Sequence, residues 1–197
     1  MEPELTLIVR LRQGDEAAFT ALYRRHKDAV YRFALLRTGS PALAADVTQE
    51  TFVHLITRSA QFDATRGSVA AWLCGVARNV ARQAAEGRED AVDPSELADD
   101  AASPATLVDA DTPLERVLRD ETADQVRAAL RELAPHYRDV FILCELSDLS
   151  YAEAAHVCGI DIGTVRSRLS RARTRLATAL EERGLLARTA GRAREAS

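Results

Sequence analysis

The residues best placed to do chemistry lie near the C-terminal end of the chain, in a segment rich in arginine. At helical spacing, four polar side chains share one face at i, i+3, i+4 and i+7: Thr164, Ser167, Arg168 and Arg171. Three more arginines flank this face: Arg166, Arg173 and Arg175. Arginine pairs bidentately with guanine, hydroxyls reach bases or phosphates, and flanking arginines suit phosphate contacts. The pattern predicts a helix that enters the major groove of DNA, with a solvated arginine-rich helix as the alternative.

The segment before this helix also favours DNA binding. Ser150 and Glu153 form a capping-box pattern that starts a short helix. Gly159 is expected to end it, because glycine tolerates the positive φ of a tight turn. Asp161 or Thr164 then begins the long helix, whose buried stripe is expected at Val165, Leu169, Ala172 and Leu176. A short helix, a turn and a basic helix together predict a helix-turn-helix.

The sequence contains no pattern typical of an enzyme or a metal site. The four histidines do not stand at ligand spacing: His26, His54, His136 and His156. The three cysteines form no C-x-x-C pair and are expected to be small buried apolar residues: Cys74, Cys144 and Cys158. A glycine-rich phosphate loop and a nucleophile elbow are both missing. We therefore expect no catalytic residue, no metal and no cofactor.

The N-terminal half is predicted to be helical. Apolar residues at three- and four-residue spacing predict helices at about 15–37 and 41–59 and a third from 69 onward, with a loop at 62–67. Ser40 and Ser68 are expected to cap the second and third helices. Because no segment alternates apolar and polar residues for long, the expected fold class is all-α.

An acidic segment divides the chain. Residues 89–124 hold 12 of the 30 acidic residues but only two of the 26 basic ones. Charge blocks of this kind are typical of linkers. The sequence therefore predicts two small helical domains, at 1–87 and 125–182, joined by a flexible acidic linker at 88–124 and followed by a disordered basic tail at 183–197. In the second domain, two helices are expected on either side of Pro135.

Length and composition restrict the class of protein. The chain has 197 residues, of which 47% are apolar and 28% charged, values that favour one or two globular domains over a disordered chain. Its longest apolar run, at 69–77, is far shorter than the roughly 18 residues that span a bilayer. The first residues lack a signal-peptide pattern. We expect a soluble cytoplasmic protein without membrane insertion.

Two sets of segments resemble a known family, the sigma-70 family of bacterial RNA polymerase sigma factors and within it the extracytoplasmic-function (ECF) group. The −35-binding region of that group is similar to the stretch LSYAEAAHVCGIDIGTVRSRLSRARTRL. Its N-terminal region resembles GDEAAFTALYRRH, DVTQETFVHL and FDATRGSVAAWLCGVARNVAR. The two sets stand in the family's order with a linker between them. The chain departs from the pattern at Asp161, where the family often has proline, and in its long acidic linker.

The resemblance implies a sigma factor that binds core RNA polymerase and directs promoter-specific initiation, and not an enzyme. The implied partners are core polymerase, through the coiled coil of its largest subunit and through its flap, promoter DNA and an anti-sigma factor. The implied polymerase-binding residues are Asp46, Gln49, Glu50 and Phe52. Asp46 and Glu50 are one helical turn apart and can face arginines of a partner helix. On residue types alone, a solvated acidic face with Phe52 in the core is the alternative.

The resemblance also implies two DNA sites. The residues implied at the −10 element are Phe62, Asp63, Arg66 and Ser68 in a pocket loop, and Arg78, Asn79 and Arg82 on the next helix. These last three are expected on the face opposite Trp72 and Val76, with Trp72 in the core and base stacking as its alternative role. The residues implied at the −35 element are Thr164, Arg166, Ser167, Arg168, Arg171 and Arg175.

Two other classes fit parts of the pattern. A helix-turn-helix regulator that binds DNA without being a polymerase subunit is the main alternative. Such a regulator needs an upstream sensor or receiver domain, and the sequence shows no pattern that predicts one. An adaptor that binds only proteins explains the helices but not the arginine face. Co-purification with core polymerase distinguishes these classes.

Overall fold

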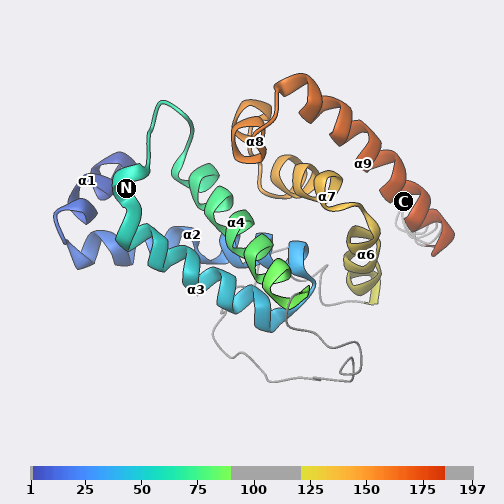
Figure 1. The fold of residues 1–197 in the computed structure, drawn as a ribbon, viewed down its shortest axis with the longest axis horizontal. Helices are drawn as coiled ribbons and strands as arrows, with labels where there is room; N and C mark the ends of the chain where they lie inside the picture. Colours follow the sequence, from blue (N-terminus) through green and yellow to red (C-terminus); the bar gives the residue numbers. More distant parts are fainter. Residues whose placement is uncertain (1, 90–120, 185–197) are drawn as a thin grey trace, which may run out of the picture. The chain divides into compact units, whose positions relative to one another are not determined.

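The computed structural model describes residues 2–89 and 121–184, which are helical in both parts (Figure 1). The chain divides into two compact units, residues 1–109 and 110–197. The described ranges contain no β-strand. The prediction of an all-α chain with two helical domains is therefore confirmed.

Unit 1 is built from helices whose starts are set by side-chain caps. Its described elements are α1 (Glu4–Arg12), α2 (Glu16–Thr38), α3 (Pro41–Arg58), the 3-10 helix η1 (Ser59–Gln61) and α4 (Val69–Glu89). The Asp15 carboxylate accepts two backbone N–H groups at the start of α2. Gly39, with φ of 72°, ends α2, and the Ser40 hydroxyl accepts a backbone N–H at the start of α3. Ser68 does the same for α4. The predicted caps at Ser40 and Ser68 are confirmed.

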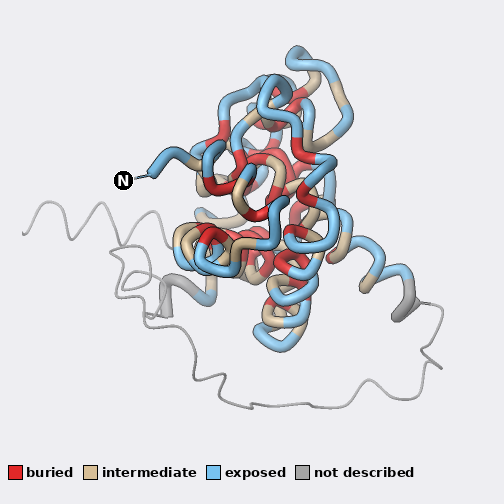
Figure 2. The backbone as a smooth tube through the Cα atoms, turned by 90° about the vertical axis from the view of Figure 1, so that its left-hand side faces the viewer, coloured by how far each residue is buried: buried red, intermediate tan, exposed pale blue. Residues whose placement is uncertain are grey.

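The long helix α2 forms the centre of unit 1, because α1, α3 and α4 all pack against it. Leu22 and Phe33 of α2, Leu55 of α3 and Leu73 of α4 are at most 1% exposed. Figure 2 shows such buried residues inside the helical bundles and exposed residues on their outer sides. Burial of each side chain of this size contributes about 1.5–3 kcal/mol to the free energy of unfolding. The loop between η1 and α4 protrudes at one end of this bundle (Figure 1).

Unit 2 contains the helix-turn-helix. Its described elements are α6 (Glu121–Glu132), α7 (Pro135–Phe141), the π-helical turn η2 (Ile142–Leu146), α8 (Tyr151–Cys158) and α9 (Ile162–Glu182). The capping box of Ser150 and Glu153 is present in full, Gly159 ends α8 with φ of 67°, and Asp161 caps α9. The helix α9 packs against α6, α7 and α8 (Figure 1). Its buried residues are those of the predicted stripe: Val165, Leu169, Ala172 and Leu176.

Three features differ from the sequence expectation. The helix α1 is an addition, and it packs on α2 through buried Leu7, Ile8 and Leu11. The π-helical turn η2 extends α7. Helix also occupies both ends of the expected linker, since α4 continues to Glu89 and α6 begins at Glu121. Residues 90–120 of that linker and 185–197 of the expected tail lie outside the described residues.

The cysteines differ in exposure. Cys74 is buried, as expected, whereas Cys144 and Cys158 are half-buried, and none of the three forms a disulfide bond within the described residues. Burial raises the pKa of the Cys144 thiol to about 11. Within residues 2–89 and 121–184, no group of three His, Cys, Asp or Glu side chains is placed to hold a metal ion. No described helix is both long and apolar enough to cross a membrane.

The capping box of α8 gives the first testable prediction. The Ser150 hydroxyl accepts the N–H of Glu153 at 3.2 Å, and the Glu153 carboxylate accepts the N–H of Ser150 at 3.0 Å. Ser150→Ala leaves the first of these N–H groups without its acceptor and should lower the free energy of unfolding of unit 2 by about 1 kcal/mol. Urea unfolding followed by circular dichroism measures the change.

A serine inside a helix provides the matched control. Ser170 is exposed in the middle of α9. Because alanine has the higher helix propensity, Ser170→Ala should be neutral or slightly stabilising. Equal effects of the two substitutions would contradict the assignment of Ser150 as a cap.

Candidate functional site

The N-terminal turn of α9 is held by Asp161. Its carboxylate accepts the backbone N–H of Thr164 at 2.9 Å and the Thr164 hydroxyl at 2.7 Å. These two hydrogen bonds lower the pKa of Asp161, and the bond from the Thr164 hydroxyl has the larger effect. The Ser167 hydroxyl in turn donates to the Thr164 carbonyl at 3.1 Å. The short polar side chains predicted to face DNA are therefore ordered by the helix start itself.

The arginines of α9 fall into two groups. Arg166 is exposed and Arg168 is half-buried on the first turns of the helix. Further along, Arg173 pairs with Glu145 at 2.5 Å, so its guanidinium lies against η2. The Arg175 guanidinium lies 4.7 Å from the centroid of the Tyr137 ring, a cation–π contact with α7.

Arg171 also reaches Tyr137. Its hydrogen bond to the tyrosine hydroxyl is the main reason that the pKa of Tyr137 is lowered, and the positive charges of Arg171, Arg175 and Arg168 act in the same direction. The predicted readout face thus has a neighbour that sequence reasoning did not identify. Helical spacing places Arg171 and Arg175 one turn apart on α9, but it cannot show which residue of α7 lies between them.

One exposed face of α3 combines acidic and apolar side chains. Asp46, Gln49 and Glu50 are exposed, as the polymerase-binding prediction requires. The Glu50 carboxylate lies 3.5 Å from Nε2 of His54, one turn further along. Val53 is 42% exposed and Ile56 is 53% exposed, so both present apolar surface to solvent. The face offers both negative charge and apolar area to a partner.

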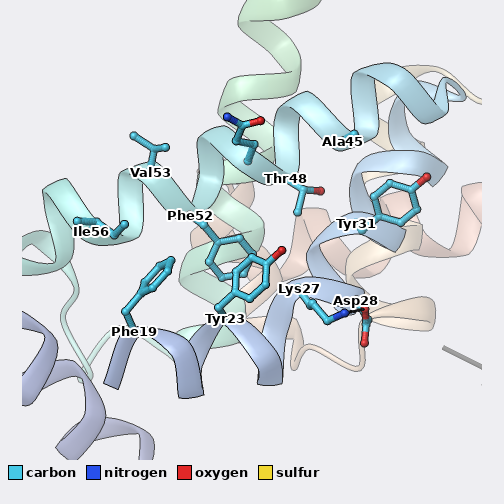
Figure 3. Close-up of a pocket in the computed structure, with 11 residues that line it drawn as sticks. Phe19, Tyr23, Lys27, Asp28, Tyr31, Ala45, Thr48, Phe52, Val53 and Ile56 are labelled. Atoms are coloured by element: carbon cyan, nitrogen blue, oxygen red, sulfur yellow. Dashed lines mark ion pairs between the residues drawn. The ribbon is translucent and has the colours of Figure 1, made fainter. Parts of the chain in front are cut away.

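A groove of about 450 Å³ lies beside this face, between α2 and α3 (Figure 3). Its lining residues are Phe19, Tyr23, Lys27, Asp28, Tyr31, Ala45, Thr48, Gln49, Phe52, Val53 and Ile56. The rings of Tyr23 and Phe52 pack edge to face with centroids 4.8 Å apart. Phe52 is only 3% exposed, so it forms the floor of the groove more than its surface. The burial of Phe52 agrees with the alternative in which it is a core residue, and its role as a polymerase contact stays a prediction.

The loop between η1 and α4 does not expose all of its predicted contact residues. Phe62 is 7% exposed, and its ring lies 6.0 Å from that of half-buried Trp72. The Asp63 carboxylate accepts the backbone N–H and the hydroxyl of Thr65 at 2.9 and 2.7 Å, which folds the loop into a turn. Arg66 and Ser68 are exposed, and Ser68 caps α4. The Phe62 ring therefore packs against Trp72 and is not presented to solvent.

The predicted −10 residues of α4 lie on more than one side of the helix. Arg82 is exposed and pairs with Glu86 at 2.8 Å, and Arg78 is half-buried. Asn79 is exposed, but it follows Trp72 by two helical turns and therefore lies along the same side of α4. The expectation that Asn79 faces away from Trp72 is wrong, because a spacing of seven residues returns a helix to nearly the same direction.

Comparison with known proteins gives a consistent result for both units. Residues 22–89 match the family model of sigma-70 region 2, and residues 123–176 match that of sigma-70 region 4. The ECF RNA polymerase sigma factor SigC of Mycobacterium tuberculosis is 35% identical over 178 residues, 89% of this chain and 90% of that protein. The chain belongs to the ECF group of the sigma-70 family.

Other relatives of this sigma-family chain differ in length. The ECF RNA polymerase sigma factor SigE of Mycolicibacterium smegmatis is 34% identical over 168 residues, which are 83% of this chain but 63% of that protein. The chain therefore spans less than two thirds of that relative. The α3 face and the first turns of α9 both lie inside the matched regions, whereas α1 lies before them.

Two solved structures resemble the sigma-family chain over most of its length. CnrH in complex with the cytosolic domain of CnrY gives a TM-score of 0.64 at 25% identity, covering 90% of this chain and 96% of that one. The sigma factor RpoE in complex with the anti-sigma factor NepR from Bartonella quintana gives 0.62 at 28% identity, covering 83% and 96%. The family resemblance stated from the sequence is confirmed.

The cap of α9 gives a pH-dependent prediction. Because the folded-state pKa of Asp161 is lowered, its contribution to stability is present above its unfolded pKa and is lost as the pH falls through the folded value. Asp161→Asn keeps an acceptor at the helix start but removes the titration. The stability advantage of the original chain over Asp161→Asn should therefore shrink on acidification from pH 6 to about pH 3. Urea unfolding across this range measures the difference, and a constant difference would contradict the prediction.

Proposed function

We propose that this chain is a sigma factor that binds core RNA polymerase and directs promoter-specific initiation. The observation that carries the proposal is the presence, on one chain, of matched regions 2 and 4, each with an exposed face of suitable chemistry. Catalysis belongs to the polymerase, and the chain supplies specificity. The alternative, a helix-turn-helix regulator that works without polymerase, accounts for α8 and α9 but does not account for the exposed acidic and apolar residues of the α3 face.

The α3 face is proposed as the polymerase-binding surface. The exposed carboxylates of Asp46 and Glu50 suit basic residues of a partner helix. Val53, Ile56 and the groove between α2 and α3 supply apolar area for the same helix. A partner helix that lies along α3 would contact both the carboxylates and the apolar area. A coiled coil such as that of the largest polymerase subunit presents a helix of this kind. Phe52 would contribute to this binding as part of the floor of the groove.

The loop and α4 are proposed to hold the −10 strand. Capture of a melted strand needs a pocket for an unstacked base and positive charge along the backbone. The turn at Asp63, exposed Arg66 and the capping Ser68 form the proposed pocket rim. Arg78, Asn79 and Arg82 continue from it along α4.

The start of α9 is proposed to read the −35 duplex. Thr164, Ser167, Arg168 and Arg171 are the proposed base-facing residues, with exposed Arg166 and Arg175 as phosphate contacts. The N-terminal turn of the recognition helix enters the groove in proteins of this architecture. The contact of Arg175 with Tyr137 gives that arginine a defined direction.

Further partners follow from the family. Both solved neighbours are complexes, one of them named as a complex with an anti-sigma factor. We infer that an anti-sigma factor also binds this chain and covers the α3 face. A cytoplasmic location and the flap of the polymerase as a partner of unit 2 complete the proposal.

Charge reversal on α3 tests the proposal directly. Replacing Asp46 and Glu50 together by arginine should abolish binding to core polymerase, because it places like charges against the partner helix. The melting temperature should change little, since exposed substitutions usually cost within about 0.5 kcal/mol. Anisotropy of the labelled full chain titrated with core enzyme measures binding.

The control reverses the same number of charges elsewhere. Glu181 and Glu182 are exposed at the end of α9, and their double replacement by arginine should leave core binding intact. Undiminished binding by the α3 variant would refute the polymerase-binding role of this face. A chain that never binds core polymerase would refute the proposed function as a whole.

The readout helix gives a second test of function. Duplexes selected by the holoenzyme from a randomised pool supply the preferred −35 sequence, and scrambled duplexes supply the reference. Arg168→Ala should cost about 1–3 kcal/mol on the preferred duplex and much less on the scrambled one. Arg166→Ala should weaken both equally and reduce the slope of log affinity against log salt by about one unit. Identical behaviour of the two variants would show that Arg168 only contacts phosphate.

A further inference from the structure

An arginine of α1 links that helix to the start of the loop between η1 and α4. The Arg12 side chain donates from Nε and Nη2 to the carbonyl of Ser59, at 3.2 and 2.8 Å. Nη2 also donates to the carbonyl of Phe62, at 2.9 Å. These acceptors are 47 and 50 residues away along the chain. One guanidinium thus ties α1 to both ends of η1.

The two acceptors are backbone carbonyls at the end of α3 and at the end of η1, and the Ser59 carbonyl also accepts the Phe62 N–H at 3.1 Å. Ser59 directly follows α3 and is the first residue of η1, and Phe62 is the C-cap that directly follows η1. Carbonyl groups at helix C-terminal ends lack donor partners within the helix and carry partial negative charge. A cationic fork that bonds two of them at once fixes their relative position, which a lysine point charge cannot do equally well.

The contact determines where the loop begins. Phe62 is held by its carbonyl on Arg12 and by its ring against Trp72. The next residue is Asp63, whose carboxylate forms the turn with Thr65. At the far end, Ser68 caps α4. The loop is therefore fixed at its entry by Arg12 and at its exit by Ser68.

We propose that Arg12 is a positioning residue for the −10 strand, which acts by holding the pocket loop and does not itself touch DNA. The proposal rests on the proposed function of that loop. It assigns a role in promoter opening to α1, a helix that precedes the matched region 2. The occupant of the loop is an unstacked base of the non-template strand.

Hydrogen exchange on the free full-length chain tests the physical part of the proposal. Arg12→Ala should raise exchange at residues 60–68 by about tenfold, because the loop loses its anchor. Arg12→Lys keeps the charge but loses the fork, so it should give a smaller rise. Unchanged exchange in Arg12→Ala would overturn the proposal whatever the chain does with DNA.

An abasic-site scan of the non-template strand tests the functional part. Holoenzyme is bound to a promoter duplex selected from a randomised pool, with a single abasic site placed at each −10 position in turn. With the original chain, loss of the captured base should weaken binding at one position. In Arg12→Ala, the loss of binding caused by the abasic site at that position should be about fivefold smaller, because Arg12 and the captured base act through the same loop. The affinity for core polymerase should stay unchanged. A merely structural defect would lower binding at every position alike.

The matched control is Arg10→Ala. Arg10 lies on the same helix and pairs with Glu2 and Asp15, away from the loop. The substitution Arg10→Ala removes the same charge as Arg12→Ala. It should leave hydrogen exchange in the loop and the loss of binding caused by the abasic site unchanged. An unaltered loss of binding from the abasic site in Arg12→Ala with a reduced salt slope would mean that Arg12 contacts a phosphate, which overturns the proposal. If the original chain selects no promoter at all, the failure belongs to the proposed function, and the exchange experiment still decides the role of Arg12.

Discussion

The structure depends on acceptors for the backbone N–H groups at helix starts, which have no partner inside their own helix. Side chains supply these acceptors at five starts within the described ranges: Asp15, Ser40, Ser68, Ser150 and Asp161. Each cap decides where one helix begins and therefore where the preceding loop ends. Both segments with proposed DNA contacts, the pocket loop and the start of α9, are closed in this way.

Because these caps are local, the sequence predicts most of the fold. The segments around Gly39, Ser40 and Gly159 carry the required residue types within a few positions, and the structure places helix ends there. The helix α1 has no such signal, since Pro3 precedes it without a side-chain cap and its nine residues are held by packing on α2. A helix stabilised mainly by tertiary contact is difficult to predict from its own sequence.

The candidate site shows the same division between local and distant information. Helical spacing correctly places the polar residues of α9 at its start, but the partners of its arginines come from elsewhere. Arg173 meets Glu145 across 28 residues, and Arg175 meets Tyr137 of α7. Periodicity also cannot decide which aromatic residue is floor and which is surface, as Phe52 shows. Arg12 escapes detection because its partners are backbone carbonyls, which any sequence supplies.

Under the proposed function, the presence of DNA contacts on two units of one chain has an energetic consequence. The base-facing side chains proposed on the first turns of α9 are few, and each would discriminate between bases by about 1–3 kcal/mol. When both units are held on one polymerase, the second DNA contact forms at high effective concentration, and the combined affinity can exceed either alone by about 10²–10⁴. Weak readout by each unit is then sufficient, because a promoter must satisfy both at the correct spacing. The α3 face, which would hold the chain on the polymerase, therefore contributes to DNA specificity without contacting DNA.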